Sequence, residues 1–338
     1  MKMTSMSENN TVYYKGSYWN DYAPVREYIN KSVSGRGDMD WSRHFASLTK
    51  KSFQKALILN CGNGWVERDL YKQGLFQSAI GVDSSPELLH EAQSAARAHG
   101  LPLDYVQLDT NMGLFPEHRF DLIVNHAAAH HVTTIDKVFR ALANLLSEDG
   151  FFVSFDYVGP HRNQYSVEAW SRLWELNQSL PEVVRHPRLC YPHYPTMLVT
   201  DPSEAVHSEL IDQMFNRYFH CLEWRGIGGA IAYPLLTHNT ALASAPKDES
   251  DFYIRKILAE DDRFRKEFPA SSLFAFFYGK PNKAILASPE RLQAFSTEEE
   301  EREWLAERNG YRYYQPNVLQ FLYEQLECQR CTIAKLEA

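Results

Sequence analysis

The stretch Lys55-Ala-Leu-Ile-Leu-Asn-Cys-Gly-Asn-Gly-Trp-Val-Glu67 decides the fold. Its apolar run, Ala56 to Leu59, ends abruptly in Asn60-Cys-Gly-Asn-Gly64, and a helix-compatible segment follows at once. A buried strand that turns through glycines into a helix brings backbone N–H groups and the positive end of the helix to one place. The pattern therefore predicts a ligand site at the carboxyl edge of a parallel sheet.

The next apolar strand indicates which ligand this is. The strand Ala79-Ile-Gly-Val82 delivers Asp83, whose carboxylate can accept hydrogen bonds from two ribose hydroxyls. A dinucleotide fingerprint needs a third small residue, and Glu67 occupies that place. The sequence thus predicts a nucleoside site and argues against NAD or FAD.

Over residues 50 to 160, the order of motifs resembles that of the class I S-adenosylmethionine (SAM)-dependent methyltransferases. Two positions depart from the family pattern, because Ile58 replaces an acidic residue and Asn60 replaces the first glycine. The resemblance implies an α/β fold, a doubly wound and mostly parallel seven-stranded sheet, with SAM as the cofactor. The motifs that carry it are Cys61-Gly-Asn-Gly64, Asp83, Leu108-Asp109, Phe120-Asp-Leu-Ile-Val-Asn125 and Gly150-Phe-Phe-Val-Ser-Phe155.

The resemblance also implies which residues bind the cofactor. The methionine part would lie on the glycine loop, the ribose on the end of the second strand, the adenine after the third strand, and the sulfonium or amino-acid group at the end of the fourth. A helix cap for Asp83 and a plain turn for Asp109 are the structural alternatives. The resemblance thus assigns Asn60, Cys61, Gly62, Asn63 and Gly64 to the methionine part, and Asp83 and Ser84 to the ribose. It assigns Asp109 and Thr110 to the adenine, and Asn125 to the sulfonium or amino-acid group.

From residue 55 onward, short apolar runs alternate with amphipathic helical stretches, which is typical of βαβ units. Strands are expected near 55–60, 79–83, 103–107, 120–125 and 150–156, and helices near 65–73, 86–99 and 134–146. Ser147-Glu-Asp-Gly150 is expected to be a turn. The family resemblance adds a final antiparallel pair, 221–225 with 272–281.

This reading divides the chain into three parts. Residues 1–50 are expected to form an N-terminal helical cap, and 51–282 the SAM-binding domain. Within that domain, 160–218 is a long insertion, rich in aromatic residues, Pro and His, that should fold as a lid over the active site. Residues 283–338 are expected to form a helical C-terminal extension.

The run Asn125-His-Ala-Ala-Ala-His-His-Val132 follows the fourth strand, which faces the transferring methyl group in this fold. A neutral imidazole can take the proton of an attacking hydroxyl, so His130 or His131 is a candidate general base. Packing or capping is the structural alternative for each. His126 and His130 are four residues apart, but the run contains no carboxylate, and no metal is expected.

Substrate contacts are predicted around the same pocket. Tyr18 could lie over the ligand, Asp156 and His161 could bind polar substrate groups, and Arg162 could pair with a carboxylate or phosphate. Thr200-Asp-Pro-Ser-Glu-Ala-Val-His-Ser208 reads as a helix start capped by Asp201. The pairing of Gly-Pro-x-Arg with Asp-Pro-Ser-Glu-Ala resembles uncharacterised bacterial methyltransferases.

Composition excludes several classes of protein. The net charge of -8 over 338 residues disfavours a surface that tracks nucleic-acid phosphates. No apolar run approaches the roughly 20 residues that span a bilayer, and the first residues lack an apolar leader. Five cysteines without a paired framework suit a reducing cytoplasm. Cys328-Gln-Arg-Cys331 lacks further nearby ligands for zinc.

We therefore predict a cytoplasmic SAM-dependent methyltransferase that acts on a small molecule or glycan precursor, with O-methylation assisted by a histidine base. N- or carboxyl-methylation of a peptide or metabolite is the alternative reaction. A non-catalytic SAM-fold binding subunit is the alternative of another class. A homodimer is left open, and neither nucleic acid nor a membrane is expected as a partner.

Overall fold

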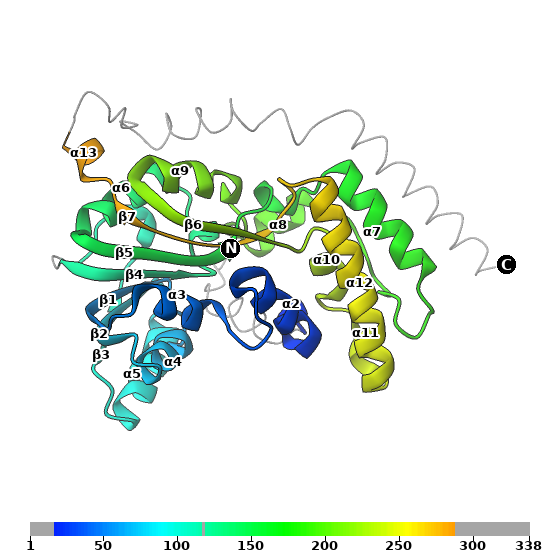
Figure 1. Cartoon of the computed structure of the whole chain (residues 1–338), viewed down its shortest axis with the longest axis horizontal. Helices are drawn as coiled ribbons and strands as arrows, with labels where there is room; N and C mark the ends of the chain where they lie inside the picture. Colours follow the sequence, from blue (N-terminus) through cyan, green and yellow to red (C-terminus); the bar gives the residue numbers. More distant parts are fainter. Residues whose placement is uncertain (1–16, 117–118, 288–338) are drawn as a thin grey trace, which may run out of the picture.

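A seven-stranded sheet forms the centre of the computed structural model, which describes residues 17–116 and 119–287 (Figure 1). The strand order is β3-β2-β1-β4-β5-β7-β6. This confirms the predicted doubly wound, mostly parallel sheet. The strands are β1 (Phe53–Leu59), β2 (Phe76–Asp83), β3 (Leu103–Gln107), β4 (Phe120–His126), β5 (Leu146–Tyr157), β6 (Phe219–Gly228) and β7 (Phe274–Pro281).

The central strand β1 explains why the apolar run is continuous rather than alternating. All four residues from Ala56 to Leu59 are buried, because helices cover both faces of a parallel sheet. On its two sides β1 pairs in parallel with β2 and β4, so that Leu57 lies opposite both Ile80 and Ile123. The strand order reverses at this point, and the crevice between β1 and β4 is where such sheets bind ligands.

The predicted antiparallel pair is confirmed. Strand β7 runs antiparallel to both β5 and β6, with Ser154 opposite Phe277 and Cys221 opposite Gly279. The predicted turn at 147–150 is wrong, because β5 already begins at Leu146. A register shift in the pairing of β4 with β5 absorbs the irregularity there.

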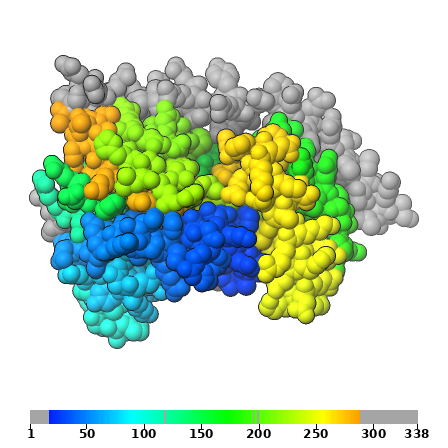
Figure 2. All heavy atoms as spheres, in the orientation of Figure 1, coloured from blue at the N-terminus to red at the C-terminus, as the bar shows by residue number. Residues whose placement is uncertain are grey.

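The three predicted helices of the βαβ units are present as α4 (Trp65–Lys72), α5 (Pro86–Ala98) and α6 (Ile135–Leu145). Helix α5 begins as expected, since the Ser85 hydroxyl accepts a hydrogen bond from Leu88 N at 3.3 Å and Pro86 follows it. In the N-terminal part lie η1 (Trp19–Asp21), α2 (Ala23–Ser34) and α3 (Trp41–Thr49). Figure 2 shows these helices on one face of the molecule, beside the later helix α12.

Two insertions elaborate the sheet. Helices α7, α10, α11 and α12 form a block beside it (Figure 1), and only the first insertion was predicted. The first insertion holds η4 (His161–Asn163), α7 (Val167–Ser179), α8 (Tyr194–Thr200), η5 (Ser208–Leu210) and α9 (Ile211–Tyr218). The second insertion holds α10 (Ala232–Leu236), α11 (Thr240–Ser244) and α12 (Lys247–Glu267), and α13 (Lys283–Leu286) follows β7.

The predicted C-terminal extension beyond residue 287, including the Cys328–Cys331 pair, lies outside the described residues. Among the helices that the structure describes, none has the length and apolar character of a membrane span. The boundaries of the three predicted parts stay predictions.

A buried carboxylate fixes the second insertion to the rest of the molecule. Asp261 on α12 is 1% exposed and accepts hydrogen bonds from the backbone N–H groups of Gly229, Ile231 and Ala232 at 2.8, 2.8 and 3.0 Å. The Tyr28 hydroxyl on α2 donates to it as well, at 2.9 Å. One side chain thus joins α12, the turn before α10, and the N-terminal helices.

We predict that Asp261→Ala lowers the free energy of unfolding by roughly 3–5 kcal/mol, because four buried donors lose their acceptor. Urea denaturation followed by circular dichroism measures this. The neighbouring Asp262, which forms partly exposed ion pairs with Arg265 and Lys266, is the matched control. Asp262→Ala should cost less than about 1 kcal/mol. Equal losses in the two variants would contradict the assigned role of Asp261.

Candidate functional site

The glycine loop after β1 has the shape that the sequence predicts. Asn60, Gly62 and Gly64 have φ angles of 41°, 56° and 77°, and Gly64 is the N-cap of α4. A Cβ atom on Gly64 would lie 2.6 Å from the Tyr105 hydroxyl and 2.8 Å from the Ala92 Cβ. Only glycine fits at this position, because a side chain would clash with Tyr105, Ala92 and Arg68.

Asp83 at the end of β2 is buried and shapes the same loop. Its Oδ2 accepts a hydrogen bond from Gly62 N at 2.8 Å, and its Oδ1 accepts one from Ser85 N at 2.9 Å. A carboxylate oxygen can accept more than one hydrogen bond, so these contacts orient Asp83 without using all of its acceptor capacity. Neighbouring Ser84 is exposed.

Asp109 and Thr110 lie after β3, as predicted. Asp109 is exposed and caps η2 (Thr110–Met112), since its Oδ1 accepts a hydrogen bond from Asn111 N at 3.0 Å. Thr110 is buried. The structure therefore shows the turn role of Asp109, and an adenine contact stays a prediction.

Asn125 has a different place from the one expected. Its side chain is fully buried and donates to Ser154 Oγ at 2.8 Å and to Asp156 Oδ2 at 2.7 Å. Its Oδ1 accepts a hydrogen bond from Ala129 N at 2.8 Å. These contacts use the amide to hold the turn that follows β4, so Asn125 is a positioning residue in this structure, and a cofactor contact stays a prediction.

Asp156 is likewise fully buried, below His130 rather than in the predicted substrate contact. Its Oδ1 lies 2.5 Å from His130 Nδ1 and accepts a hydrogen bond from Tyr157 N, while its Oδ2 accepts one from Ala129 N at 2.8 Å. Burial raises the pKa of Asp156, but His130 and the other donors lower it by more, so the carboxyl group is ionised at neutral pH.

Both candidate histidines lie in η3 (Ala129–His131), directly after β4. Burial lowers the pKa of His130, but the Asp156 carboxylate raises it by more, and the pKa reaches about 9. For His131, burial and then the neighbouring His130 lower the pKa. The His131 Nδ1 lies 3.3 Å from the Ser203 carbonyl oxygen and 3.2 Å from its hydroxyl. The two adjacent imidazoles therefore differ strongly in basicity.

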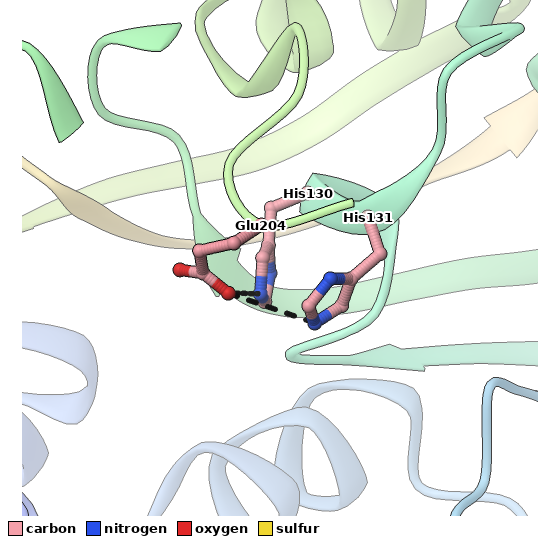
Figure 3. Close-up of side chains that lie close together, drawn as sticks. All are labelled: His130, His131 and Glu204. Atoms are coloured by element: carbon pink, nitrogen blue, oxygen red, sulfur yellow. Dashed lines mark ion pairs between the residues drawn. The ribbon is translucent and has the colours of Figure 1, made fainter. Parts of the chain in front are cut away.

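A third ionisable group reaches the histidines from the first insertion. Glu204 Oε2 lies 3.9 Å from His130 Nε2 and 4.0 Å from His131 Nε2 (Figure 3). The predicted helix start at Asp201 is wrong, since residues 201–207 form a turn in which Ala205 and His207 have positive φ angles of 51° and 53°. This turn directs Glu204 to the histidines.

Arg162, predicted to bind a substrate anion, instead holds this turn. Its guanidinium donates to the backbone carbonyls of Asp201, Pro202 and Glu204 at 3.3, 2.5 and 3.2 Å. A bond from Val206 N to the His130 carbonyl, at 2.9 Å, joins the turn to η3. Arg162 is therefore a positioning residue for Glu204.

The other predicted residues lie around this centre. His161 stacks on His207 with ring centroids 5.2 Å apart, and Tyr18 packs its ring edge against His238 at 5.2 Å. His126, the third histidine of the run, points elsewhere. Its ring packs against Trp41 and Phe155, with centroid distances of 5.5 and 5.6 Å, and those two rings also contact each other.

Sequence reasoning missed the aromatic wall to which His126 belongs. Trp65, the first residue of α4, is 52% exposed and meets His126 edge-on, with centroids 5.5 Å apart. An exposed tryptophan directly after the glycine loop is the signal that could have revealed it.

Residues 57–154 match the family model described as a methyltransferase domain. An uncharacterized methyltransferase of Bacillus subtilis, YcgJ, is 28% identical over 141 residues, which are 36% of this chain and 56% of that protein. EEF1A lysine methyltransferase 4 of Mus musculus is 26% identical over 177 residues, which are 46% of this chain and 66% of that protein. The chain thus spans between about half and two thirds of these relatives. The solved structure of YcgJ has a TM-score of 0.41 and 19% identity, covering 71% of this chain and 97% of that one.

A buried acid behind the glycine loop yields a prediction about pH. Glu67 on α4 is 0% exposed, and burial raises its pKa from 4.5 to about 7. Between these values the folded protein holds a proton that the unfolded chain has lost. The contribution of Glu67 to the free energy of unfolding is therefore largest below pH 4.5 and decreases as the pH rises through 7.

Glu67→Gln should remove this decrease, so that the variant gains roughly 3 kcal/mol relative to wild type between pH 4.5 and pH 8. Denaturant unfolding across that pH range measures it. Glu91→Gln changes an exposed carboxylate on α5 and serves as the control. Parallel pH curves for wild type and Glu67→Gln would contradict the prediction.

Proposed function

We propose that this chain, which belongs to the class I SAM-dependent methyltransferase superfamily, transfers a methyl group from SAM to a hydroxyl group of a small molecule or glycan precursor. The observation that carries the proposal is the juxtaposition of the glycine loop with the His130–Asp156 pair at neighbouring strand ends. Leu59 of β1 lies opposite Asn125 of β4, and Asn60 Nδ2 donates to the Ala128 carbonyl at 3.3 Å.

SAM is the cofactor, and the loop fits it. The close packing of Gly64 against Tyr105 and Ala92 fixes the turn into α4, and the first-turn N–H groups of α4 suit a carboxylate such as that of methionine. We assign Asn60 to Gly64 to the methionine part, Asp83 with Ser84 to the ribose, and Asp109 with Thr110 to the adenine edge. Bound there, SAM supplies a methyl group already activated by the positive sulfur.

The protein's own contribution is to orient the acceptor and remove its proton. We assign that proton to His130 Nε2, because the contact of Nδ1 with Asp156 fixes the ring and stabilises the imidazolium that forms. His131 lacks a carboxylate on Nδ1 and is the weaker base.

An amine or carboxyl acceptor is the second candidate reaction, since mouse EEF1A lysine methyltransferase 4, one of the relatives, is named for a lysine acceptor. Incubation with methyl-labelled SAM and pooled small molecules separates the possibilities. A base-stable, uncharged product is an ether, a product that base hydrolyses is an ester, and a cationic product is an amine. Binding of SAM without transfer to any pool would favour a non-catalytic subunit. A cytoplasmic location and a homodimer stay predictions.

We predict that Asp83→Ala weakens SAM binding by about 2–3 kcal/mol, from the loss of charge-assisted bonds to the ribose. Calorimetric titration of wild type and variant with SAM, and of wild type with NADH, measures this. Thermal unfolding of the ligand-free proteins controls for the loop contacts that Asp83 also makes. Tight NADH binding without SAM binding would exclude the proposed cofactor site.

We predict that His130→Asn lowers kcat by roughly 10²–10⁴ while SAM affinity stays near normal. Because the pKa of His130 is raised to about 9, kcat/KM of the wild type should rise with pH and level off above that value. Rates of label transfer across pH 6–10 test both points. His131→Asn should cost less, and a wild-type rate and pH profile in His130→Asn would place the base elsewhere.

A further inference from the structure

The ligand atoms of three side chains lie close together in the site, with a gap between them (Figure 3). The ligand atoms of His130, His131 and Glu204 all lie within 4.8 Å of one another, and Glu204 Oε2 is 3.9 and 4.0 Å from the two Nε2 atoms. These separations exceed a hydrogen bond. The three groups therefore surround a common point instead of bonding to each other.

The partners of the Nδ1 atoms determine what the Nε2 atoms present to this gap. His131 Nδ1 faces the carbonyl oxygen of Ser203, so Nδ1 carries the hydrogen and Nε2 the lone pair. His130 Nδ1 faces the carboxylate of Asp156, which directs the lone pair of its neutral form to Nε2 as well. When both imidazoles are neutral, two Nε2 lone pairs and one carboxylate oxygen thus converge.

Two of these three groups, His131 and Glu204, receive no hydrogen bond in the gap from another part of the described chain. Among the described residues, no N–H or O–H group donates a hydrogen bond to His131 Nε2 or to the Glu204 carboxylate. The Glu204 carboxylate faces the gap at His130 Nε2, and the Asp156 carboxylate lies behind the same ring at Nδ1, so both add negative charge near the gap. A positively charged occupant is favoured by both features.

We propose that His130, His131 and Glu204 bind a divalent transition-metal ion such as Zn²⁺. Two imidazoles and one carboxylate are a ligand set that zinc accepts, with a fourth position left open. A histidine that binds a metal through one ring nitrogen needs a hydrogen-bond partner on the other. Asp156 is that partner for His130 Nδ1, and Ser203 is that partner for His131 Nδ1. Metal–ligand bonds of about 2.0–2.2 Å require the three atoms to draw closer, and the partly exposed Glu204 can move inward.

The consequence for catalysis rests on the proposed function. A metal ion on His130 Nε2 uses the electron pair that would otherwise accept the proton of the acceptor hydroxyl. The ion and the reaction therefore compete for one atom, and a loaded site should transfer methyl groups more slowly than an empty one.

Titration of the metal-free full chain with Zn²⁺ by calorimetry, and with Co²⁺ by visible absorption, tests the site directly. We expect a saturable site with one ion per chain that depends on Glu204 and His131. Glu204→Gln and His131→Asn should each weaken it at least ten-fold. His99→Asn, which changes an exposed histidine on the surface, should leave the affinity unchanged.

A second cluster of possible ligands provides the sharpest contrast. His161, His207 and Glu209 also place their ligand atoms within 4.8 Å of one another. Loss of binding in a His161→Asn/His207→Asn variant, with wild-type affinity in Glu204→Gln and His131→Asn, would overturn the assignment. A titration that finds no saturable site would also overturn the assignment. Circular dichroism and SAM titration verify that each variant is folded.

Label transfer with and without Zn²⁺ then separates this inference from the proposed function. Slower transfer in wild type, relieved by a chelator, supports the competition. Faster transfer with Zn²⁺ would confirm the site but overturn the competition. Absence of SAM binding and of methyl transfer would reject the proposed function, and the metal titration would still test the metal site on its own.

Discussion

The site depends on one fully buried carboxylate. Asp156 lies near the end of β5 and accepts hydrogen bonds from the Asn125 side chain and from the backbone N–H groups of Ala129 and Tyr157, and it also contacts His130. An ionised group at this depth is stable only with several donors around it. Those donors belong to β4, to the turn after it and to β5, so a single charge fixes the geometry of all three. The basicity of His130 follows from the same contact.

Much of the fold could be predicted because its signals are local. The apolar run before Gly62, the proline after Ser85 and the alternation of strands with helices each depend on a few consecutive residues, and they placed the central strands and helices correctly. The seven-stranded, doubly wound sheet and its final antiparallel pair followed from the family resemblance, not from any spacing in the chain. The second insertion, with the long helix Lys247–Glu267, was missed, because its fixation depends on Asp261 and distant backbone groups.

The site was harder to predict, since its key contacts join residues far apart in sequence. The histidine pair was recognised from its position after a strand, yet nothing local indicates that Asp156 lies beneath it. Arg162 shows the same limit. An arginine near a pocket suggests an anion, whereas here it satisfies the carbonyls of a turn some forty residues later. Asp201-Pro-Ser-Glu204 has the residues of a helix start, but that arginine and two positive φ angles hold it as a turn.

These contacts divide the site between two sources. The core sheet supplies the glycine loop, Asp83 and the buried Asp156, and their geometry is set by strand pairing and close packing. The insertion supplies Glu204, which is held by backbone bonds to Arg162 and to η3 rather than by the sheet. Under the proposed function, the residues assigned to the cofactor thus belong to the sheet, whereas Glu204 belongs to the insertion. His130 contacts both parts of the site, because Asp156 of the core orients its Nδ1 and Glu204 of the insertion faces its Nε2.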